Sequence, residues 1–91
     1  METVCFRVLV SGRVQGVFFR ANTRAKALEY GVNGWVRNLP DGRVEAQLEG
    51  SYESVGRLVA FMLRGPPHAR VDRLEASRVA CEGRRGFEII Y

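Results

Sequence analysis

The sequence predicts an α+β sandwich, in which two helices cover one face of an antiparallel sheet. Two observations support this fold class. Several segments alternate apolar and polar residues with the period of a β-strand, while two others carry apolar residues at helical spacing. These segments follow one another as strand, helix, strand, strand, helix and strand, with a short strand at the end. The length of 91 residues fits a single domain, residues 1–91, with one core.

The first strand is expected over residues 4–10, because apolar residues occupy every second position there. A loop with two glycines follows over residues 11–19. A helix then extends from about Arg20 to Tyr30, before Gly31, which suits a helix stop. The apolar side of this helix is expected to include Ala21, Ala25 and Leu28.

A β-hairpin is predicted next, with residues 32–38 as its first strand and residues 43–49 as its second. The turn Leu39-Pro40-Asp41-Gly42 joins them, because proline presets φ and glycine permits a positive φ. In the second strand, alternate residues should face the core, namely Val44, Ala46 and Leu48. The others should point outward, namely Arg43, Glu45, Gln47 and Glu49.

A second helix is predicted after Ser51, which suits an N-cap, and Gly65-Pro66-Pro67 ends it. Its core-facing stripe is expected to comprise Val55, Leu58, Val59, Met62 and Leu63.

Two strands are predicted after this helix. Residues 71–81 form the first, and its apolar parity slips between Val71 and Leu74, which suggests a bulge. After a turn, residues 87–91 alternate in a short final strand. Two right-handed crossovers around a hairpin give the split βαβ, or ferredoxin-like, arrangement.

The charge of the chain favours an anionic partner. Its formal net charge is +4. Lys26 is the only lysine, so the other basic side chains that carry this charge are arginines. The planar fork of arginine suits phosphate oxygens. Charge alone leaves nucleic acid, a membrane surface and a small phosphate compound open. The chain lacks an apolar run that could span a membrane, and its first residues lack a signal-peptide pattern, so we expect a cytoplasmic protein.

The cysteines and the single histidine do not suggest a metal site. Cys5 and Cys81 are too few and too far apart for a disulfide scaffold or a zinc site, and His68 lies beside two prolines. In the predicted fold, Cys5 opens the first strand and Cys81 closes its antiparallel neighbour, so the two should lie close together. We expect free thiols, because a cytosolic compartment disfavours disulfides. No metal or cofactor is expected.

The loop before the first helix is the strongest candidate for a binding site. It connects a strand to a helix N-terminus, where backbone N–H groups lack partners and can bind an anion. Gly16 would let the backbone approach the ligand, and Arg20 stands where the helix begins. On these residues alone, an equally good interpretation is that the glycines only make a turn and Arg20 points into solvent.

Asn38 is the second candidate, at the end of the second strand. In the predicted fold this strand is parallel to the first, so Asn38 and Ser11 lie at the same edge of the sheet. An amide side chain accepts and donates, so it can hold a water molecule. The alternative, which these residues alone favour, is an Asx-type turn residue.

Two long segments of the sequence resemble the acylphosphatase family. The first is Gly12-x-Val14-Gln15-Gly16-Val17-x-Phe19-Arg20. The second is Gly34-Trp35-Val36-Arg37-Asn38, followed by Gly42-x-Val44 and Gly50. Residues 87–91 also look like the last strand of that family, so the resemblance covers essentially the whole chain. One departure is Leu39, where family members often have serine or threonine.

This resemblance implies a monomeric hydrolase that converts acyl phosphates to a carboxylate and inorganic phosphate without a metal. It implies that Asn38 orients the attacking water and that Arg20 binds the phosphoryl group together with loop amides. Those amides belong to Gln15, Gly16, Val17, Phe18 and Phe19. Inorganic phosphate is then expected as product and inhibitor, while nucleic acid and membranes are not expected as partners.

Two other functions compete with this hypothesis. One is an RNA-binding module on a similar fold, but such modules place aromatic residues on their third strand, and residues 43–49 have none. The other is a non-catalytic anion-binding domain. An assay of acyl phosphate hydrolysis separates them.

Overall fold

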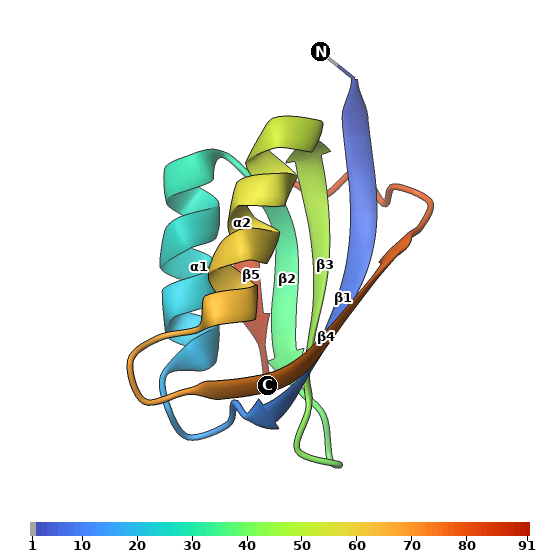
Figure 1. Cartoon of the computed structure of the whole chain (residues 1–91). Coiled ribbons are helices and arrows are strands. Elements are labelled where there is room, and N and C mark those ends of the chain that lie inside the picture. Colours follow the sequence, from blue (N-terminus) through green and yellow to red (C-terminus); the bar gives the residue numbers. More distant parts are fainter. Residues whose placement is uncertain (1) are drawn as a thin grey trace.

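The computed structural model describes residues 2–91 and contains the predicted elements in the predicted order. Both helices lie on one face of a single sheet, as the sequence indicated (Figure 1). The elements are β1 (Thr3–Arg13), α1 (Phe19–Tyr30), β2 (Asn33–Asn38), β3 (Val44–Ser51), α2 (Tyr52–Arg64), β4 (Arg70–Arg78) and β5 (Phe87–Ile90).

The sheet has the strand order β4-β1-β3-β2-β5. β1 pairs antiparallel with β3 and β4, and β2 pairs antiparallel with β3. β1 and β2 therefore point the same way, as expected, and both end at the same edge of the sheet. The terminal strand β5 is present but pairs parallel with β2, so the five-stranded sheet is mixed rather than wholly antiparallel.

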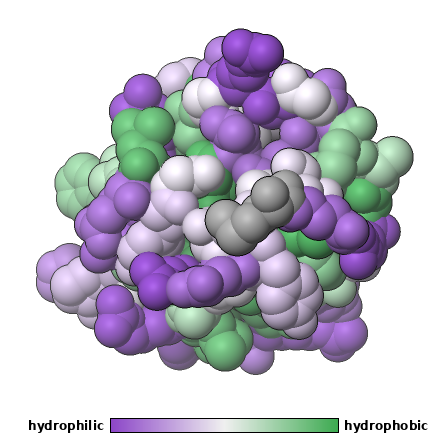
Figure 2. Space-filling view, turned by 90° about the horizontal axis from the view of Figure 1, so that it is seen from above, coloured by the Kyte–Doolittle hydropathy of each residue, from purple (hydrophilic) through white to green (hydrophobic). Residues whose placement is uncertain are grey.

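The core lies between the sheet and the two helices. Alternate residues of β1 and β3 are buried there, as predicted from their spacing: Val4, Val8, Val10, Val44, Ala46 and Leu48. Viewed from the end of the sheet where the N-terminus lies, the surface is mainly polar, with apolar residues in separate patches (Figure 2). No helix within residues 2–91 is long and apolar enough to cross a membrane.

The buried face of α1 differs from the prediction. The helix begins at Phe19, one residue earlier than expected, and its buried residues are Phe19, Thr23 and Ala27. Ala21, Ala25 and Leu28 instead face away from the core. The reason is that the Phe19 ring packs into the core, and the positions four and eight residues later share its face.

α2 follows the prediction more closely. The Ser51 hydroxyl accepts a hydrogen bond from the Ser54 N–H (3.1 Å), which confirms the N-cap. Val55, Leu58 and Met62 are buried, but Leu63 is exposed and Phe61 takes its place in the core. An irregularity in β4 is also confirmed, because the register against β1 shifts between Ser11 and Gly12.

The open face of the sheet is more covered than the alternation of β3 suggested. Glu45, Gln47 and Glu49 point away from the helices, yet all three are buried. Glu45 lies between Arg7 and Arg37, and both arginines donate hydrogen bonds to its carboxylate. Burial alone would raise the pKa of Glu45, but these hydrogen bonds outweigh it and hold the pKa below its usual value.

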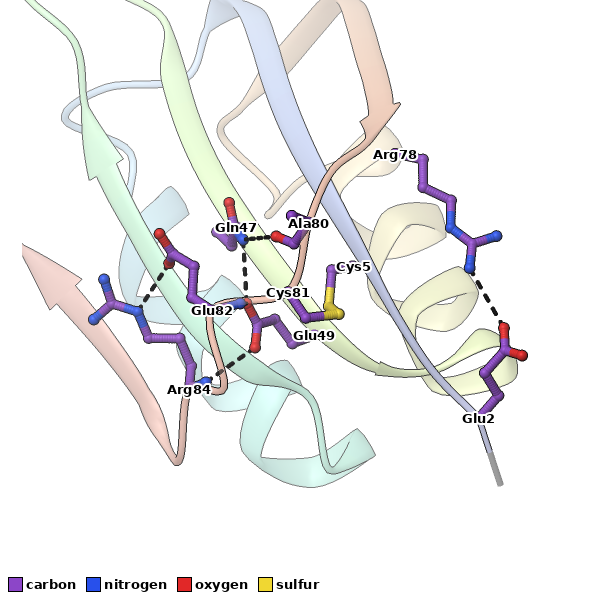
Figure 3. Close-up of a disulfide and its surroundings, with 9 residues drawn as sticks. All are labelled: Glu2, Cys5, Gln47, Glu49, Arg78, Ala80, Cys81, Glu82 and Arg84. Carbon is purple, nitrogen blue, oxygen red and sulfur yellow. Dashed lines mark hydrogen bonds and ion pairs between the residues drawn. A yellow bond between two sulfur atoms is a disulfide. The ribbon is translucent and has the colours of Figure 1, made fainter.

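Residues 79–86, here called the crossing segment, cover the other end of this face. They follow β4 and lead to β5 at the far side of the sheet (Figure 1). The Glu49 carboxylate accepts hydrogen bonds from the backbone N–H groups of Glu82 (2.8 Å) and Arg84 (3.0 Å) (Figure 3). Burial raises the pKa of Glu49, but these N–H groups outweigh it and lower the pKa overall. Glu49 therefore holds the crossing segment against β3.

The two cysteines form a disulfide, and the expectation of free thiols is wrong. They do lie close together, with a Cα–Cα distance of 5.3 Å, as expected (Figure 3). However, Cys81 belongs to the crossing segment and not to β4, which ends at Arg78. The Cys5 side chain is buried on the open face, where the crossing segment brings Cys81 over it. The expectation of free thiols rested on an assumed compartment and not on the tertiary structure, which brings the two cysteines into disulfide geometry.

Removing the disulfide should lower the melting temperature strongly. It joins residues separated by 76 positions, so it restricts the unfolded chain, and such bonds contribute about 2–4 kcal/mol. In a domain of this size, that loss corresponds to a fall in Tm of roughly 10–30 °C. The measurement is a melting curve with and without reductant. The double variant Cys5→Ser, Cys81→Ser is the control, since reductant should not change its Tm. Two reactive thiols in the unfolded, non-reduced protein would contradict the disulfide.

Candidate active site

The loop between β1 and α1 curls tightly at the helix N-terminus. Gly16 has a φ of 73° and Phe18 a φ of 62°, and both lie in the left-handed region. Glycine adopts this conformation without a steric penalty, whereas phenylalanine does not. Phe18 occupies the N-cap position of α1 but provides no side-chain cap. The loop therefore brings consecutive N–H groups to the start of the helix.

These N–H groups are available to bind an anion. The first helical hydrogen bond extends from the Asn22 N–H to the Phe18 carbonyl (3.0 Å). In the part of the chain that the structure describes, the N–H groups of residues 16–20 donate to no carbonyl and no side chain. The helix dipole also favours negative charge at this point. We call residues 14–19 together with these N–H groups the cradle loop.

A pocket of about 330 Å³ lies beside the cradle loop. Residues from three parts of the chain form its walls: the cradle loop and first turn of α1, the end of β2, and the end of β5. Its lining residues are Val14, Gly16, Phe18, Phe19, Arg20, Ala21, Asn38, Ile89 and Tyr91. The pocket therefore brings together Arg20 and Asn38, the two side chains that the sequence singled out.

Arg20 lines this pocket and is half-buried. Its guanidinium lies 5.0 Å from the centre of the Tyr91 ring. Among residues 2–91, no carboxylate forms an ion pair with Arg20 and no acceptor takes a hydrogen bond from it. Its donors can therefore serve a ligand.

Asn38 is the last residue of β2. Its side-chain Oδ1 is buried and accepts no hydrogen bond from any residue between 2 and 91. The alternative role, as an Asx-type turn residue, is instead filled by Asp41. The Asp41 carboxylate accepts a hydrogen bond from the Arg43 N–H (3.0 Å). Asn38 thus lines the pocket, and its Oδ1 has no structural task in the turn.

Two of the expected binding residues do not line the pocket. Val17 is buried in the core. The Gln15 side chain instead donates two hydrogen bonds across the hairpin turn, to the carbonyls of Leu39 (2.8 Å) and Arg43 (3.0 Å). Gln15 therefore joins the cradle loop to the backbone that immediately follows Asn38. The backbone N–H groups of both residues still belong to the curled loop.

Ile89 and Tyr91 are lining residues that sequence reasoning did not identify. The alternation of residues 87–91 predicted a strand but not its partner. Because β5 pairs parallel with β2, with Val36 opposite Ile89, the C-terminal ends of both strands lie at the same edge of the sheet. That edge is where Asn38 and the cradle loop meet. Ile89 and Tyr91 could not be identified from the sequence because the parallel pairing of β5 with β2 was not predicted.

Potential metal ligands do not gather near this pocket. Within residues 2–91, no group of three or more His, Cys, Asp or Glu side chains is placed to hold a metal ion. The only polar side chains that line the pocket are those of Arg20, Asn38 and Tyr91. A ligand in this pocket would contact a guanidinium, backbone N–H groups, an amide and a phenol.

Comparison with known proteins identifies the family. The acylphosphatase family model matches residues 6–89. An acylphosphatase of Rubrobacter xylanophilus is 57% identical over 97% of this chain and 81% of its own, and one of Methanothrix thermoacetophila is 53% identical over 98% and 99%. The solved structure of an acylphosphatase from Coxiella burnetii matches with a TM-score of 0.94 and 38% identity, covering 98% of this chain and 94% of its own. The chain belongs to the acylphosphatase family.

Proposed function

We propose that this chain hydrolyses acyl phosphates to a carboxylate and inorganic phosphate, with Arg20 and Asn38 as its catalytic side chains. Arg20 and the N–H groups of the cradle loop bind the phosphoryl oxygens. Asn38 orients the attacking water through its side-chain amide. The observation that carries this proposal is that one pocket is lined by Arg20, Asn38 and the cradle loop. Among residues 2–91, Arg20 has no ion partner and the N–H groups of residues 16–20 have no acceptor.

The reaction balances without further catalytic groups. The water oxygen forms a bond to phosphorus, and the bond from phosphorus to the acyl oxygen breaks, with its electron pair leaving on the carboxylate. One proton of the water passes to a phosphate oxygen. Carboxylates have a pKa of roughly 4, so the leaving group needs no general acid. Phosphoryl transfer then depends on positioning and on stabilisation of charge, which Arg20 and the N–H groups supply.

The two competing functions are less well supported. An RNA-binding module would need an exposed, aromatic surface on β3. The open face of β3 is instead occupied by buried Glu45, Gln47 and Glu49, under two arginines and the crossing segment. A purely anion-binding domain would use Arg20 and the N–H groups, but it would not need the Asn38 amide in the same pocket.

The test is hydrolysis of acetyl phosphate and benzoyl phosphate in the presence of a strong chelator. We expect turnover to survive chelation, and inorganic phosphate to inhibit competitively, because the groups that line the pocket bind the phosphoryl group directly. The specific activity should not depend on protein concentration, since one chain supplies every lining residue and we propose a monomer. A phosphate monoester is the control substrate and should react far more slowly. Loss of activity on chelation, restored by magnesium or zinc, would overturn the mechanism.

A further inference from the structure

We propose that the pocket selects acyl phosphates whose acyl group is aromatic, and that the Phe18 ring is the determinant of this selection. The inference rests on the proposed hydrolysis of acyl phosphates. It concerns the part of the substrate that Arg20 and Asn38 do not hold.

Phe18 has a backbone conformation and a solvent exposure that are both unfavourable for a phenylalanine. Its φ of 62° is a conformation that favours glycine or asparagine over a bulky residue. Its side chain is 75% exposed, so the ring gains little from burial in the free protein. The adjacent Phe19 is only 1% exposed and provides the contact with the core. The ring of Phe18 is therefore not needed to hold the loop, and it stands at the pocket as a free apolar surface.

The depth of the pocket residues indicates where the acyl group lies. The Asn38 Oδ1 is buried, whereas Phe18 and Tyr91 are 75% and 96% exposed. The two rings therefore lie at the solvent-exposed side of the pocket, and Asn38 is less exposed than either ring. In an in-line displacement, the leaving group departs on the side opposite the attacking water. Water oriented by Asn38 therefore places the acyl group on the side of the phosphorus away from that water, and the exposed Phe18 ring is available to contact it.

The pocket offers an apolar surface to that group. Phe18, Ile89 and Tyr91 line the pocket together with Arg20 and Asn38. A planar aromatic acyl group can contact the Phe18 ring, in an offset or edge-to-face arrangement, and removes apolar surface of both partners from water. An acetyl group is too small to do so. The difference should appear in kcat/KM, because the contact persists as the bond breaks.

The test compares kcat/KM for benzoyl phosphate and acetyl phosphate in the wild type and in Phe18→Ala. Alanine keeps the Cβ and the backbone N–H and removes only the ring. The two substrates share the phosphoryl group, so any disturbance of the cradle loop cancels in the ratio. We expect the ratio of benzoyl to acetyl to fall about tenfold, which corresponds to about 1.4 kcal/mol. In Phe18→Leu this ratio should fall less, since leucine retains an apolar side chain.

Tyr52→Ala is the matched control. Tyr52 is 74% exposed at the start of α2 and does not line the pocket, so its variant should keep the wild-type ratio. A wild-type ratio in Phe18→Ala would overturn the inference, and so would an equal fall in Tyr52→Ala. If the wild type hydrolysed neither substrate, the proposed function itself would be wrong. The two failures are therefore distinguishable.

Discussion

Arg20→Ala should lower kcat/KM for an acyl phosphate by about a thousandfold or more, with the fold intact. The guanidinium binds the phosphoryl oxygens and stabilises the charge that they carry in the transition state. A charge-assisted contact of this kind contributes roughly 1.5–3 kcal/mol to binding, and arginines that act on a transferring phosphoryl group accelerate it by about 10³-fold or more. Inhibition by inorganic phosphate should weaken together with turnover, because both depend on the same contact.

The stability of the Arg20→Ala protein should change little. Arg20 makes no ion pair among the described residues, and its one aromatic contact, with Tyr91, is at an exposed ring. Such contacts contribute about 0.5–1 kcal/mol. Arg20→Lys should recover little activity, since an ammonium lacks the planar fork that matches two phosphate oxygens.

Arg57→Ala is the control for the loss of one positive charge. Arg57 lies on the exposed side of α2 and pairs with Glu53, remote from the cradle loop. Its variant should show wild-type kcat/KM and wild-type inhibition by phosphate. Equal losses in both variants would mean that the overall charge, and not the position of Arg20, attracts the substrate. A folded Arg20→Ala enzyme with near-normal kcat/KM would remove Arg20 from the mechanism.

The sequence predicted the layers of the fold because its local patterns are strong. Alternation defines β1 and β3, and the apolar stripe with the Ser51 cap defines α2. The pattern was weaker in α1, where the buried positions are Phe19, Thr23 and Ala27. Two of these three are small or polar, so the alanines on the other side of the helix gave a misleading apolar face. The start of the helix was also hidden, because Phe18 caps it without the usual side-chain signal.

Contacts between distant segments could not be predicted from periodicity. The parallel pairing of β5 with β2 and the crossing segment over β3 depend on tertiary structure. They account for the buried Glu49, for the disulfide and for Tyr91 at the pocket. By contrast, the meeting of Arg20 and Asn38 followed from topology, because β1, which leads to the cradle loop, and β2, which ends at Asn38, end at the same edge of the sheet. For Gln15, the sequence predicted its place in the loop before α1. It did not predict that the side chain bonds to the hairpin turn.

Asn38→Ala should lower kcat by two or more orders of magnitude, with little change in the inhibition constant of inorganic phosphate. Asn38 would act on the attacking water and not on the bound phosphate, so its contribution belongs to the transition state. Gln15 supports this role, because its hydrogen bonds to Leu39 and Arg43 fix the backbone beside Asn38. Asn38→Asp should also be slow: it keeps the shape, but adds a negative charge next to the phosphoryl group and loses the N–H donor.

Melting temperature separates this role from that of a turn residue. An asparagine that stabilised the turn would cost roughly 1 kcal/mol of stability on replacement and leave kcat unchanged. The structure gives that task to Asp41, whose carboxylate accepts the Arg43 N–H and pairs with the Arg43 guanidinium. Asp41→Ala is therefore the matched control, and should lower Tm by a few degrees without lowering kcat. Asn38→Ala should do the reverse, because its Oδ1 makes no hydrogen bond within residues 2–91 that replacement could break. An Asn38→Ala protein with reduced Tm and wild-type kcat would leave Arg20 as the only side chain supported in catalysis.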